Sequence, residues 1–435
     1  MTWWGRLAAA LLFLVMFSRI KISNEDTREE GSIYIGQDSL SVFAPLTQAP
    51  SLNGASENTI KNNDSFVGPH DNETPIEAPL VNTVNLTAVG DLMVHQWQLD
   101  SAYNASSATY DFRHGFELVT PYLTAADFTI GNLETTFAGR DMGISEYPRF
   151  NTPDEFGEAL RDTGFDLLST ANNHTNDKNA AGIFRTLDVL DSLDIGHTGS
   201  YRSKEESEQL TIVNVNGIDI AFLSYTYGTN GIPLQYDWSM NLLEDEKIEA
   251  DILQACSIAD FIIVIPHMGD EYVENTSEAY RARARAMLKL GADMVLASHP
   301  HVVQPYEFVT VTDDDGSERN CFIIYSLGNF ISSQRTLPRD QGIILNASIE
   351  QHGGDKPVIK SVSFVPTWVR FINSSGAYDI QTLSIFDALT GAVDVQGLRE
   401  QDKTRMRNAH TYITNHLLGY PVGIEDMQNE YFVYP

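Results

Sequence analysis

Residues 293–305, DMVLASHPHVVQP, form a short apolar run that ends in two histidines with one residue between them. In an extended segment, side chains two residues apart point to the same side. We therefore expect His299 and His301 to present two imidazole rings to one point just beyond the edge of a sheet, where ligands often bind in α/β proteins. An isolated pair of this kind is more often part of a polar loop, so the hypothesis depends on how other strands end.

Other predicted strands also end in residues that can bind a metal ion. They cover 84–89, 127–130, 165–170 and 261–265, and are followed by Asp91, Glu134, Asn173 and His267 respectively. Carboxylate, amide and imidazole groups from different loops are the ligands that a hydrolytic site for one or two divalent ions requires. The sequence therefore predicts one site built from these four residues and the two histidines, with Mn, Zn, Fe or Mg as candidate ions.

Helices alternate with these strands, which is the βαβ pattern of a mostly parallel sheet. The helical periodicity covers 154–162, 181–193, 247–258 and 277–290. Asn216-Gly217 between two apolar runs predicts a β-hairpin. Two further apolar runs, 342–349 and 358–365, predict antiparallel strands and a core between two sheets.

The composition excludes some partners. The chain has 435 residues and a net charge of -31, from 59 acidic and 28 basic side chains. Such a charge argues against binding nucleic acid. It also repels an anionic polymer, so any contact with one must be local, through metal or arginines. The arginines at 281, 283 and 285 are interpreted as the solvated face of a helix.

The amino terminus resembles an export signal, because an apolar run over 7–17 follows Arg6. We expect 1–22 to be a signal-anchor or a signal peptide. No small-x-small cleavage site follows the run, which favours an uncleaved anchor and an extracytoplasmic, membrane-anchored protein; a secreted protein and a buried helix of a cytosolic protein are the alternatives. Residues 23–82 have the composition of a disordered linker. The main domain is predicted over 83–370, followed by a carboxyl-terminal appendage over 371–435.

Six motifs occur in a fixed order along more than half of the chain. They are AVGDLM, FTIGNLETTFAG, STANNHTND, IPHMGDEY, ASHPHVVQP and YSLGNFI. In this order they resemble the CapA family of capsule and poly-gamma-glutamate synthesis proteins, which is similar in turn to the calcineurin-like metallophosphoesterases. The resemblance implies a four-layer α/β/β/α sandwich with a dinuclear metal centre between two sheets.

The resemblance also implies roles for single residues. The metal positions match Asp91, Glu134, Asn173, His267, His299 and His301, and the histidine that can protonate a leaving group matches His174. Two departures stand out: Met93 occupies a position where phosphoesterases have a histidine, with His95 two places further on, and Glu134 stands where they carry an aspartate. One metal position could therefore lack a ligand.

The function expected from these observations is capsule or poly-gamma-glutamate synthesis or export, with a metal-dependent, phosphoesterase-like hydrolase site. If the site is catalytic, the metal activates water and His174 acts as general acid. The expected partners are an anionic surface polymer or its synthesis machinery, and the membrane through the amino-terminal segment. Two alternatives remain, a non-catalytic tether that holds a polymer or partner subunits, and a plain extracytoplasmic phosphodiesterase.

Overall fold

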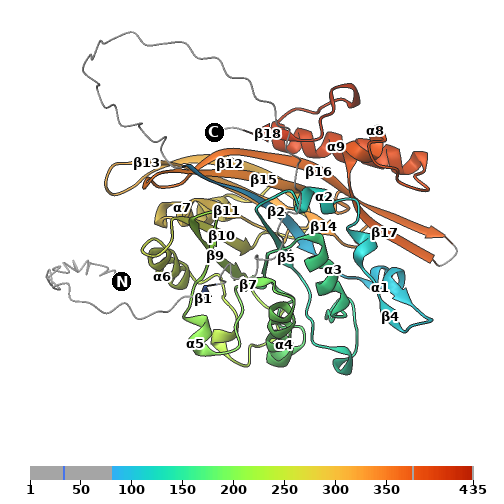
Figure 1. Cartoon of the computed structure of the whole chain (residues 1–435), viewed down its shortest axis with the longest axis horizontal. Helices are drawn as coiled ribbons and strands as arrows, with labels where there is room; N and C mark the ends of the chain where they lie inside the picture. The colour runs from blue at the N-terminus through green and yellow to red at the C-terminus, as the bar shows by residue number, and fades with distance from the viewer. Residues whose placement is uncertain (1–32, 35–80, 375–376, 434–435) are drawn as a thin grey trace, which may run out of the picture. The chain divides into compact units, whose positions relative to one another are not determined.

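The structure is a computed structural model that describes residues 33–34, 81–374 and 377–433. Within them, two β-sheets form the framework of a mixed α/β fold (Figure 1). The first has seven strands, in the order β1 (Ile33–Tyr34), β8 (Thr211–Val215), β9 (Ile218–Thr226), β10 (Phe261–His267), β11 (Met294–Leu296), β13 (Glu318–Leu327) and β12 (Val303–Thr312).

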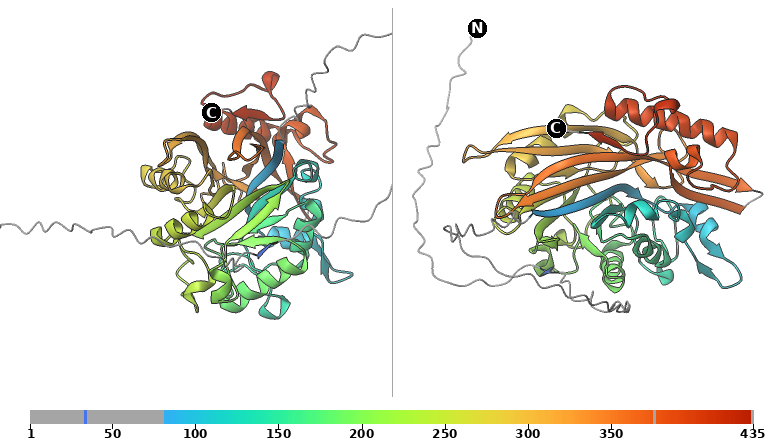
Figure 2. Two further views of the ribbon diagram at one scale, coloured as in Figure 1. Left: turned by 60° about the vertical axis from the view of Figure 1, so that its left-hand side comes forward. Right: turned by 45° about the horizontal axis from the view of Figure 1, so that its top comes forward.

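The second sheet has nine strands among the described residues. Seven follow in the order β17 (Ala377–Ser384), β16 (Val358–Ser374), β15 (Gln341–His352), β2 (Val81–Leu92), β5 (Phe128–Leu133), β6 (Leu167–Ser169) and β7 (Gly196–Thr198). In addition, β14 (Asn329–Ile331) pairs with β2 and β18 (Tyr431–Val433) pairs with β16. In Figure 2 the blue strand β2 lies along the long orange strands, of which β15 is its direct neighbour. A separate small sheet consists of β3 (Tyr103–Asn104) and β4 (Thr109–Tyr110).

The predicted helices and antiparallel strands are present, with small shifts at their ends. The α-helices of the described chain are α1 (Gln96–Ala102), α2 (Thr120–Leu123), α3 (Glu155–Thr163), α4 (Asn179–Ser192), α5 (Lys204–Ser207), α6 (Asp245–Ala255), α7 (Glu278–Leu290), α8 (Ile385–Thr390) and α9 (Glu400–Leu418). Short 3-10 helices cover Arg113–Gly115, Arg140–Met142, Asp237–Ser239 and Ile424–Asp426. The hairpin predicted at Asn216-Gly217 joins β8 to β9, and β15 pairs with β16 as expected.

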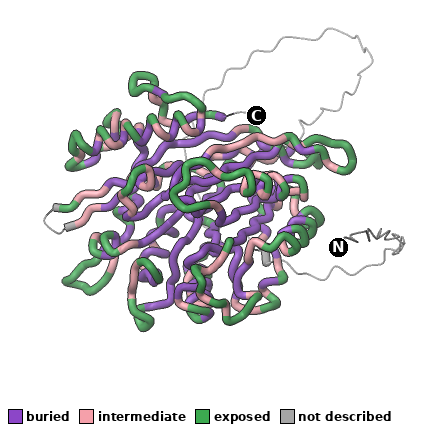
Figure 3. The backbone as a smooth tube through the Cα atoms, turned by 180° about the vertical axis from the view of Figure 1, so that it is seen from behind, coloured by how far each residue is buried: buried purple, intermediate pink, exposed green. Residues whose placement is uncertain are grey.

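Apolar side chains hold the sheets and helices together. Phe128 of the second sheet stacks on Phe222 of the first, with ring centroids 5.3 Å apart, in a cluster that both sheets share. The opposite face of the second sheet packs on α3 through residues such as Phe156. The opposite face of the first packs on α6 and α7 through residues such as Ile252 and Met287. Figure 3 shows the buried residues in the middle of the fold and exposed turns around them.

Parallel pairing brings several strand ends to the same edges. Within the second sheet β2, β5, β6 and β7 are parallel. In the first sheet β9, β10, β11 and β13 are parallel. Because parallel strands end at the same edge of their sheet, loops far apart in sequence are placed close together at their carboxyl ends. This geometry positions the candidate site.

The segment expected as an appendage, 371–435, contributes to the large sheet and its core wherever it is described. The strand β17 continues the sheet beyond β16. The short strand β18 also pairs with β16, outside the main order of strands. Met406 and Ile413 of α9 lie in the cluster that the two sheets share. The described residues from 81 onward belong to one compact unit by their contacts. The predicted domain boundaries stay predictions, but these described elements are packed against the main domain.

The amino-terminal predictions, 1–22 as a signal-anchor and most of 23–82 as a linker, lie outside the described residues. Among the residues that are described, no helix is both long and apolar enough to cross a membrane.

Deleting residues 1–79 is expected to leave a domain that melts cooperatively. The described core begins at Val84, and β1 contributes only a two-residue pairing with β8. Calorimetry of the shortened and full chains measures the transition. As a contrast, deleting 1–92 removes β2 from the middle of its sheet and should abolish the transition. Loss of the transition in the shorter deletion would contradict a boundary near residue 80.

Candidate metal centre

The candidate ligands lie where the parallel strands end. Asp91 is near the carboxyl end of β2, Glu134 directly follows β5, and His267 is the last residue of β10. The remaining three are in loops, Asn173 after β6 and His299 and His301 after β11. Each of the six is at most 3 % exposed. The structure therefore brings the six predicted residues to one buried place, while their role as ligands stays a prediction.

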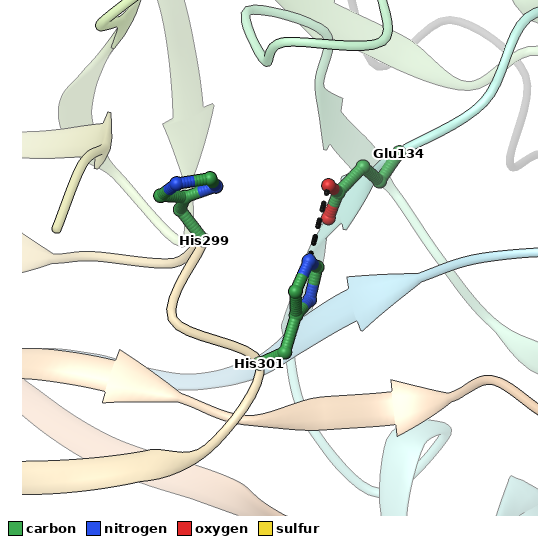
Figure 4. A group of neighbouring side chains, drawn as sticks. All are labelled: Glu134, His299 and His301. Atoms are coloured by element: carbon green, nitrogen blue, oxygen red, sulfur yellow. Dashed lines mark ion pairs between the residues drawn. The ribbon is translucent and has the colours of Figure 1, made fainter. Parts of the chain in front are cut away.

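Glu134 lies at the centre of the cluster. Its Oε1 atom is 3.6 Å from Nε2 of His267 and 3.7 Å from Nε2 of His301. Figure 4 shows the carboxylate facing His301, with the His299 ring on the other side of the same space. Two overlapping groups have potential ligand atoms within 4.8 Å of one another, namely Glu134 with His299 and His301, and Asp91 with Glu134 and His267.

Asp91 and Asn173 extend the cluster on two sides. Oδ2 of Asp91 is 3.0 Å from Nδ1 of His301. Oδ1 of Asn173 is 2.8 Å from Nε2 of His267. The same imidazole atom of His267 thus faces both the Asn173 amide oxygen and the Glu134 carboxylate. Such a convergence of donors from the ends of five strands is the arrangement that a bound cation requires.

The two histidines of the His-Pro-His stretch converge, but the predicted extended backbone is wrong. His299 has φ 107° and His301 has φ 58°, both on the left-handed side of the Ramachandran map. For residues other than glycine this conformation is strained, at a cost of about 1–3 kcal/mol each. The loop is held by a hydrogen bond from the Tyr272 amide to the Pro300 carbonyl, 2.8 Å long. The rings therefore meet, with centroids 5.9 Å apart, through a turn and not through strand alternation.

Burial controls the charge of the cluster. It raises the pKa of Glu134 well above its usual range, and the nearby charge of Asp91 adds to this. Burial lowers the pKa of His267 well below its usual range, with a further contribution from His299. Burial, followed by the charge of His301, lowers the pKa of His299 to about 3. Two of these imidazoles are therefore neutral near pH 7, which is the form that binds metal ions.

Two buried atoms of the cluster have no hydrogen-bond partner, Oε1 of Glu134 and Nδ1 of His299. Leaving a buried acceptor unpaired costs about 1–3 kcal/mol. A divalent cation between them would satisfy both, because carboxylate oxygen and neutral imidazole nitrogen are suitable ligands. The residues that are present thus fit a divalent metal ion.

His174 is held differently from the candidate ligands. Its Nδ1 atom is 2.8 Å from Oδ2 of Asp177, which also accepts a hydrogen bond from the Phe150 amide at 2.7 Å. The Phe150 ring packs edge-on against the imidazole, with centroids 4.6 Å apart. Because the Asp177 carboxylate accepts a hydrogen bond from Nδ1–H, Nε2 is the ring nitrogen available for acid–base chemistry. Nε2 is 3.5 Å from Nδ2 of Asn230.

Three asparagines hold the cluster in place. Asn132 donates from Nδ2 to Asp91 at 2.8 Å. Asn329 has its Oδ1 atom 3.1 Å from Nδ1 of His301. Both asparagines therefore support candidate ligands through hydrogen bonds. The third, Asn230, accepts from Asn173 at 3.2 Å and was missed, because its only sequence signal is a turn-forming Asn-Gly pair.

His95 does not join the candidate ligands. Its Nδ1 accepts a hydrogen bond from the Ser333 amide at 3.3 Å, and its ring packs edge-on against Phe150. Burial lowers the pKa of His95 to about 4. His95 lies in the loop before α1, where it is half-buried and packed beside the site. Met93, at the position where phosphoesterases carry a histidine, is buried.

Exposed tyrosines surround the cluster. The Tyr227 ring lies 4.5 Å from that of His299, and Tyr272 lies 5.8 Å from His301, measured between centroids. Tyr147 lies 6.4 Å from His174 in the same measure. All three are exposed. They form the rim through which a ligand would approach the buried groups.

Replacing Asn132 by alanine is expected to weaken metal binding about tenfold to a hundredfold, because a group that orients ligands is lost. Titration of the protein with Mn or Zn, monitored by calorimetry, measures the affinity for the metal. Asn151→Ala is a matched control: Asn151 is an equally buried asparagine whose amide bonds only Gly139, Gly143 and Ala138, so it should lower stability without changing metal affinity. Equal losses in the two variants would contradict a specific role for Asn132.

Comparison with known proteins agrees with the motifs. The sequence model of the family described as bacterial capsule synthesis protein PGA_cap matches residues 85–334, which is more than half of the chain. The chain belongs to this family. It is 28 % identical over 273 residues to the capsule biosynthesis protein CapA of Bacillus anthracis, covering 60 % of this chain and 63 % of that protein. It is 29 % identical over 282 residues to the PGA biosynthesis protein CapA of Bacillus subtilis (strain 168), covering 62 % and 70 %. The chain thus spans less than two thirds of the first of these relatives.

Solved structures are similar to this chain at lower sequence identity. The calcineurin-like phosphoesterase YfkN of Bacillus subtilis has a TM-score of 0.37 and 12 % identity, covering 77 % of this chain and 98 % of that one. The Thermus thermophilus sulfate thiohydrolase SoxB, solved with glycerol, has a TM-score of 0.33 and 10 % identity, covering 66 % and 43 %.

Proposed function

We propose that this protein takes part in making or exporting an anionic surface polymer, such as poly-gamma-glutamate, and that its buried cluster is a metal-dependent hydrolase site. One observation carries the site: carboxylates and imidazoles from separate strand ends lie within 4.8 Å, and Oε1 of Glu134 and Nδ1 of His299 have no hydrogen-bond partner among the described residues. The polymer is supported by the family and by the names of the two Bacillus relatives. The bond that is cleaved would be a phosphoester or amide bond in the polymer or its precursor.

The six clustered residues would hold one or two divalent ions, Mn, Zn, Fe or Mg. One set consists of Glu134, His299 and His301, and the other of Asp91, Glu134 and His267, so Glu134 is common to both. Asn173 would add an amide oxygen beside His267. A bound ion would supply Lewis-acid polarisation of the substrate and a lower pKa for water. The protein itself keeps the ligands buried, neutral where they are imidazoles, and oriented by Asn132 and Asn329.

His174 is the proposed proton donor. Asp177 holds Nδ1, so Nε2 is the atom that would give a proton to the leaving group. Asn230 beside Nε2 would orient either the imidazole or the substrate. The edge-on contact with Phe150 fixes the ring plane, which keeps the donor in one orientation.

The proposed location is extracytoplasmic, with 1–22 as a membrane anchor and 23–82 as a linker, or with a cleaved signal and secretion as the alternative. This proposal is supported by the apolar run over 7–17 behind Arg6. The synthesis machinery of the polymer is the proposed partner.

Metal analysis of the purified full chain, combined with turnover assays, tests the proposal. The expected result is about one or two divalent ions per chain, and hydrolysis of a phosphoester or amide substrate with at least one of the four metals. Chelation should lower the melting temperature, because an ion that binds only the folded state stabilises it. Absence of turnover with every metal, together with capsule production that survives Asp91→Ala and His299→Ala, would contradict the enzyme and assign the protein the role of a tether.

A further inference from the structure

Positive charge is scarce in this chain, with 28 basic against 59 acidic residues. Most basic side chains of the described part form ion pairs with carboxylates, as Arg185 does with Asp154 and Arg319 with Asp293. Within that part, the basic side chains without a carboxylate oxygen within 4.0 Å are Arg149, Lys178, Lys289, Arg339 and Arg407. In so acidic a protein, an unpaired cation marks a place where an anion is tolerated or attracted.

The arginines of α7 are not among them: their side chains are half-exposed on the helix surface, but each one forms an ion pair. Arg281 and Arg285 both pair with Glu307, and Arg283 pairs with Asp245. Their positive charge is therefore neutralised within the fold. A contact between this protein and an anionic chain must use other cations.

Arg149 and Lys178 lie together on the His174 side of the cluster. Nε of Arg149 donates to the carbonyl oxygen of Asp177 at 2.8 Å, and Asp177 is both the neighbour of Lys178 in sequence and the partner of His174. Burial and then the charge of Arg149 lower the pKa of Lys178, as expected for two adjacent cations. Arg149 is exposed and Lys178 is half-buried. Two unpaired positive charges thus stand beside the proposed proton donor.

Arg339 lies near His301, by contact with Tyr272. Its guanidinium carbon is 3.3 Å from the centroid of the Tyr272 ring, and that ring stacks beside His301. The backbone of Arg339 is tied to the cluster, because its carbonyl accepts from Asn329 at 2.9 Å. Glu271 is an acidic neighbour of Tyr272 on this side, and its charge acts on the Tyr272 hydroxyl. Arg339 must offset this charge before it can attract an anion.

We propose that Arg149 with Lys178 on one side, and Arg339 on the other, form two anion-binding subsites that hold successive negative groups of a chain across the metal cluster. The inference rests on the proposed function, since it describes how the same site takes its substrate. It assigns the site to the interior of a polyanionic chain and not to a single charged monomer. It also explains how a protein with a net charge of -31 can bind such a chain, because the attraction is local and screened from the distant acidic surface.

Binding of a labelled γ-linked glutamate decamer to the full chain, in a non-ionic detergent at low salt, tests the inference. Arg149→Ala, Lys178→Ala and Arg339→Ala should each weaken binding about fivefold, because each removes one nearby opposite charge. Glu271→Gln should act in the opposite direction and tighten binding about twofold or more, since it removes a repulsive charge. A γ-linked dimer should bind far more weakly than the decamer and respond less to the substitutions.

Lys289→Ala and Arg407→Ala are matched controls, because each removes one unpaired cation that contacts no candidate ligand within the described residues. They should change the affinity by less than about twofold when the measurement is repeated at about 0.15 M salt, where the Debye length is only about 8 Å and contacts beyond the site are largely screened. Equal weakening in site and control variants would overturn the inference in favour of a general charge effect. So would unchanged binding in all three site variants, or absence of binding of both the glutamate decamer and linear polyphosphate to the wild-type protein.

Two further measurements distinguish this inference from the proposed function. Linear polyphosphate replaces the glutamate chain in a second arm; the same pattern of losses with polyphosphate alone would support the subsites and assign them to phosphate groups. Metal content is measured in every variant. Normal metal content and turnover with unchanged chain binding in all three site variants would overturn the subsites while leaving the hydrolase proposal standing. Loss of metal in Asp91→Ala, with chain binding still dependent on Arg149 and Arg339, supports the subsites independently of catalysis.

Discussion

Replacing Asp91 or His299 by alanine is expected to lower metal affinity about a hundredfold or more and to bring turnover below detection. Each substitution removes a buried donor from one of the two overlapping groups of candidate ligands found among the described residues. His299→Ala removes an imidazole whose Nδ1 has no other partner. Asp91→Ala also deprives His301 of the carboxylate 3.0 Å from its Nδ1. Metal content by mass spectrometry and hydrolysis rates measure the two effects.

The chain contains a matched control for these variants. His114 and Asp379 form a second histidine–aspartate pair, also 3.0 Å apart, but both lie outside the cluster and His114 is exposed. His114→Ala and Asp379→Ala should therefore leave metal content and turnover close to wild type. If they lower metal content as strongly as Asp91→Ala and His299→Ala do, the loss reflects general destabilisation. In that case the cluster would not be the metal site.

The position of the site could be predicted because each part of the signal is local. An apolar run followed by Asp91, Glu134 or His267 identifies a strand and the polar group at its end. Parallel pairing then brings such ends together, whatever their distance in sequence. The prediction therefore required only the type of each element and not its exact bounds.

The backbone of His299 and His301 could not be predicted in the same way. The residues 297–302 are as compatible with an extended strand as with a turn, and positive φ values in a non-glycine residue depend on the contacts that hold them. Here one of those contacts is the amide of Tyr272, from a loop some thirty residues away in sequence, bonded to the Pro300 carbonyl. Tertiary structure thus decides a conformation that the local sequence leaves open.

Other residues were missed because they lack any periodic signal. Asn230 lies in the irregular loop after β9, and its contacts with Asn173 and His174 depend on how that loop folds back. The ion pairs of the arginines could not be predicted either, because Arg281 and Arg285 are on helix α7 and their partner Glu307 is on strand β12. Charge counted along a sequence does not show which charges remain free after folding.

Replacing His174 by alanine is expected to separate proton donation from metal binding. The variant should keep its metal, because His174 points its Nε2 atom toward Asn230 and its Nδ1 atom toward Asp177, and neither of these is in the candidate ligand groups. Hydrolysis of substrates with poor leaving groups should slow by about a hundredfold or more, because general acid catalysis contributes this much. Aryl phosphodiesters, which need little protonation of the leaving group, should slow by less than about tenfold. Rates for a series of leaving groups measure the difference.

Asp177→Asn provides the companion variant, because the amide can no longer act as a charged acceptor for Nδ1–H of His174, while the Phe150 contact remains. It should show the same dependence on the leaving group as His174→Ala, to a smaller extent, with metal content unchanged. A parallel loss on good and poor leaving groups would show that His174 binds the substrate or the metal and does not donate the proton. Loss of metal in His174→Ala would place this imidazole among the ligands.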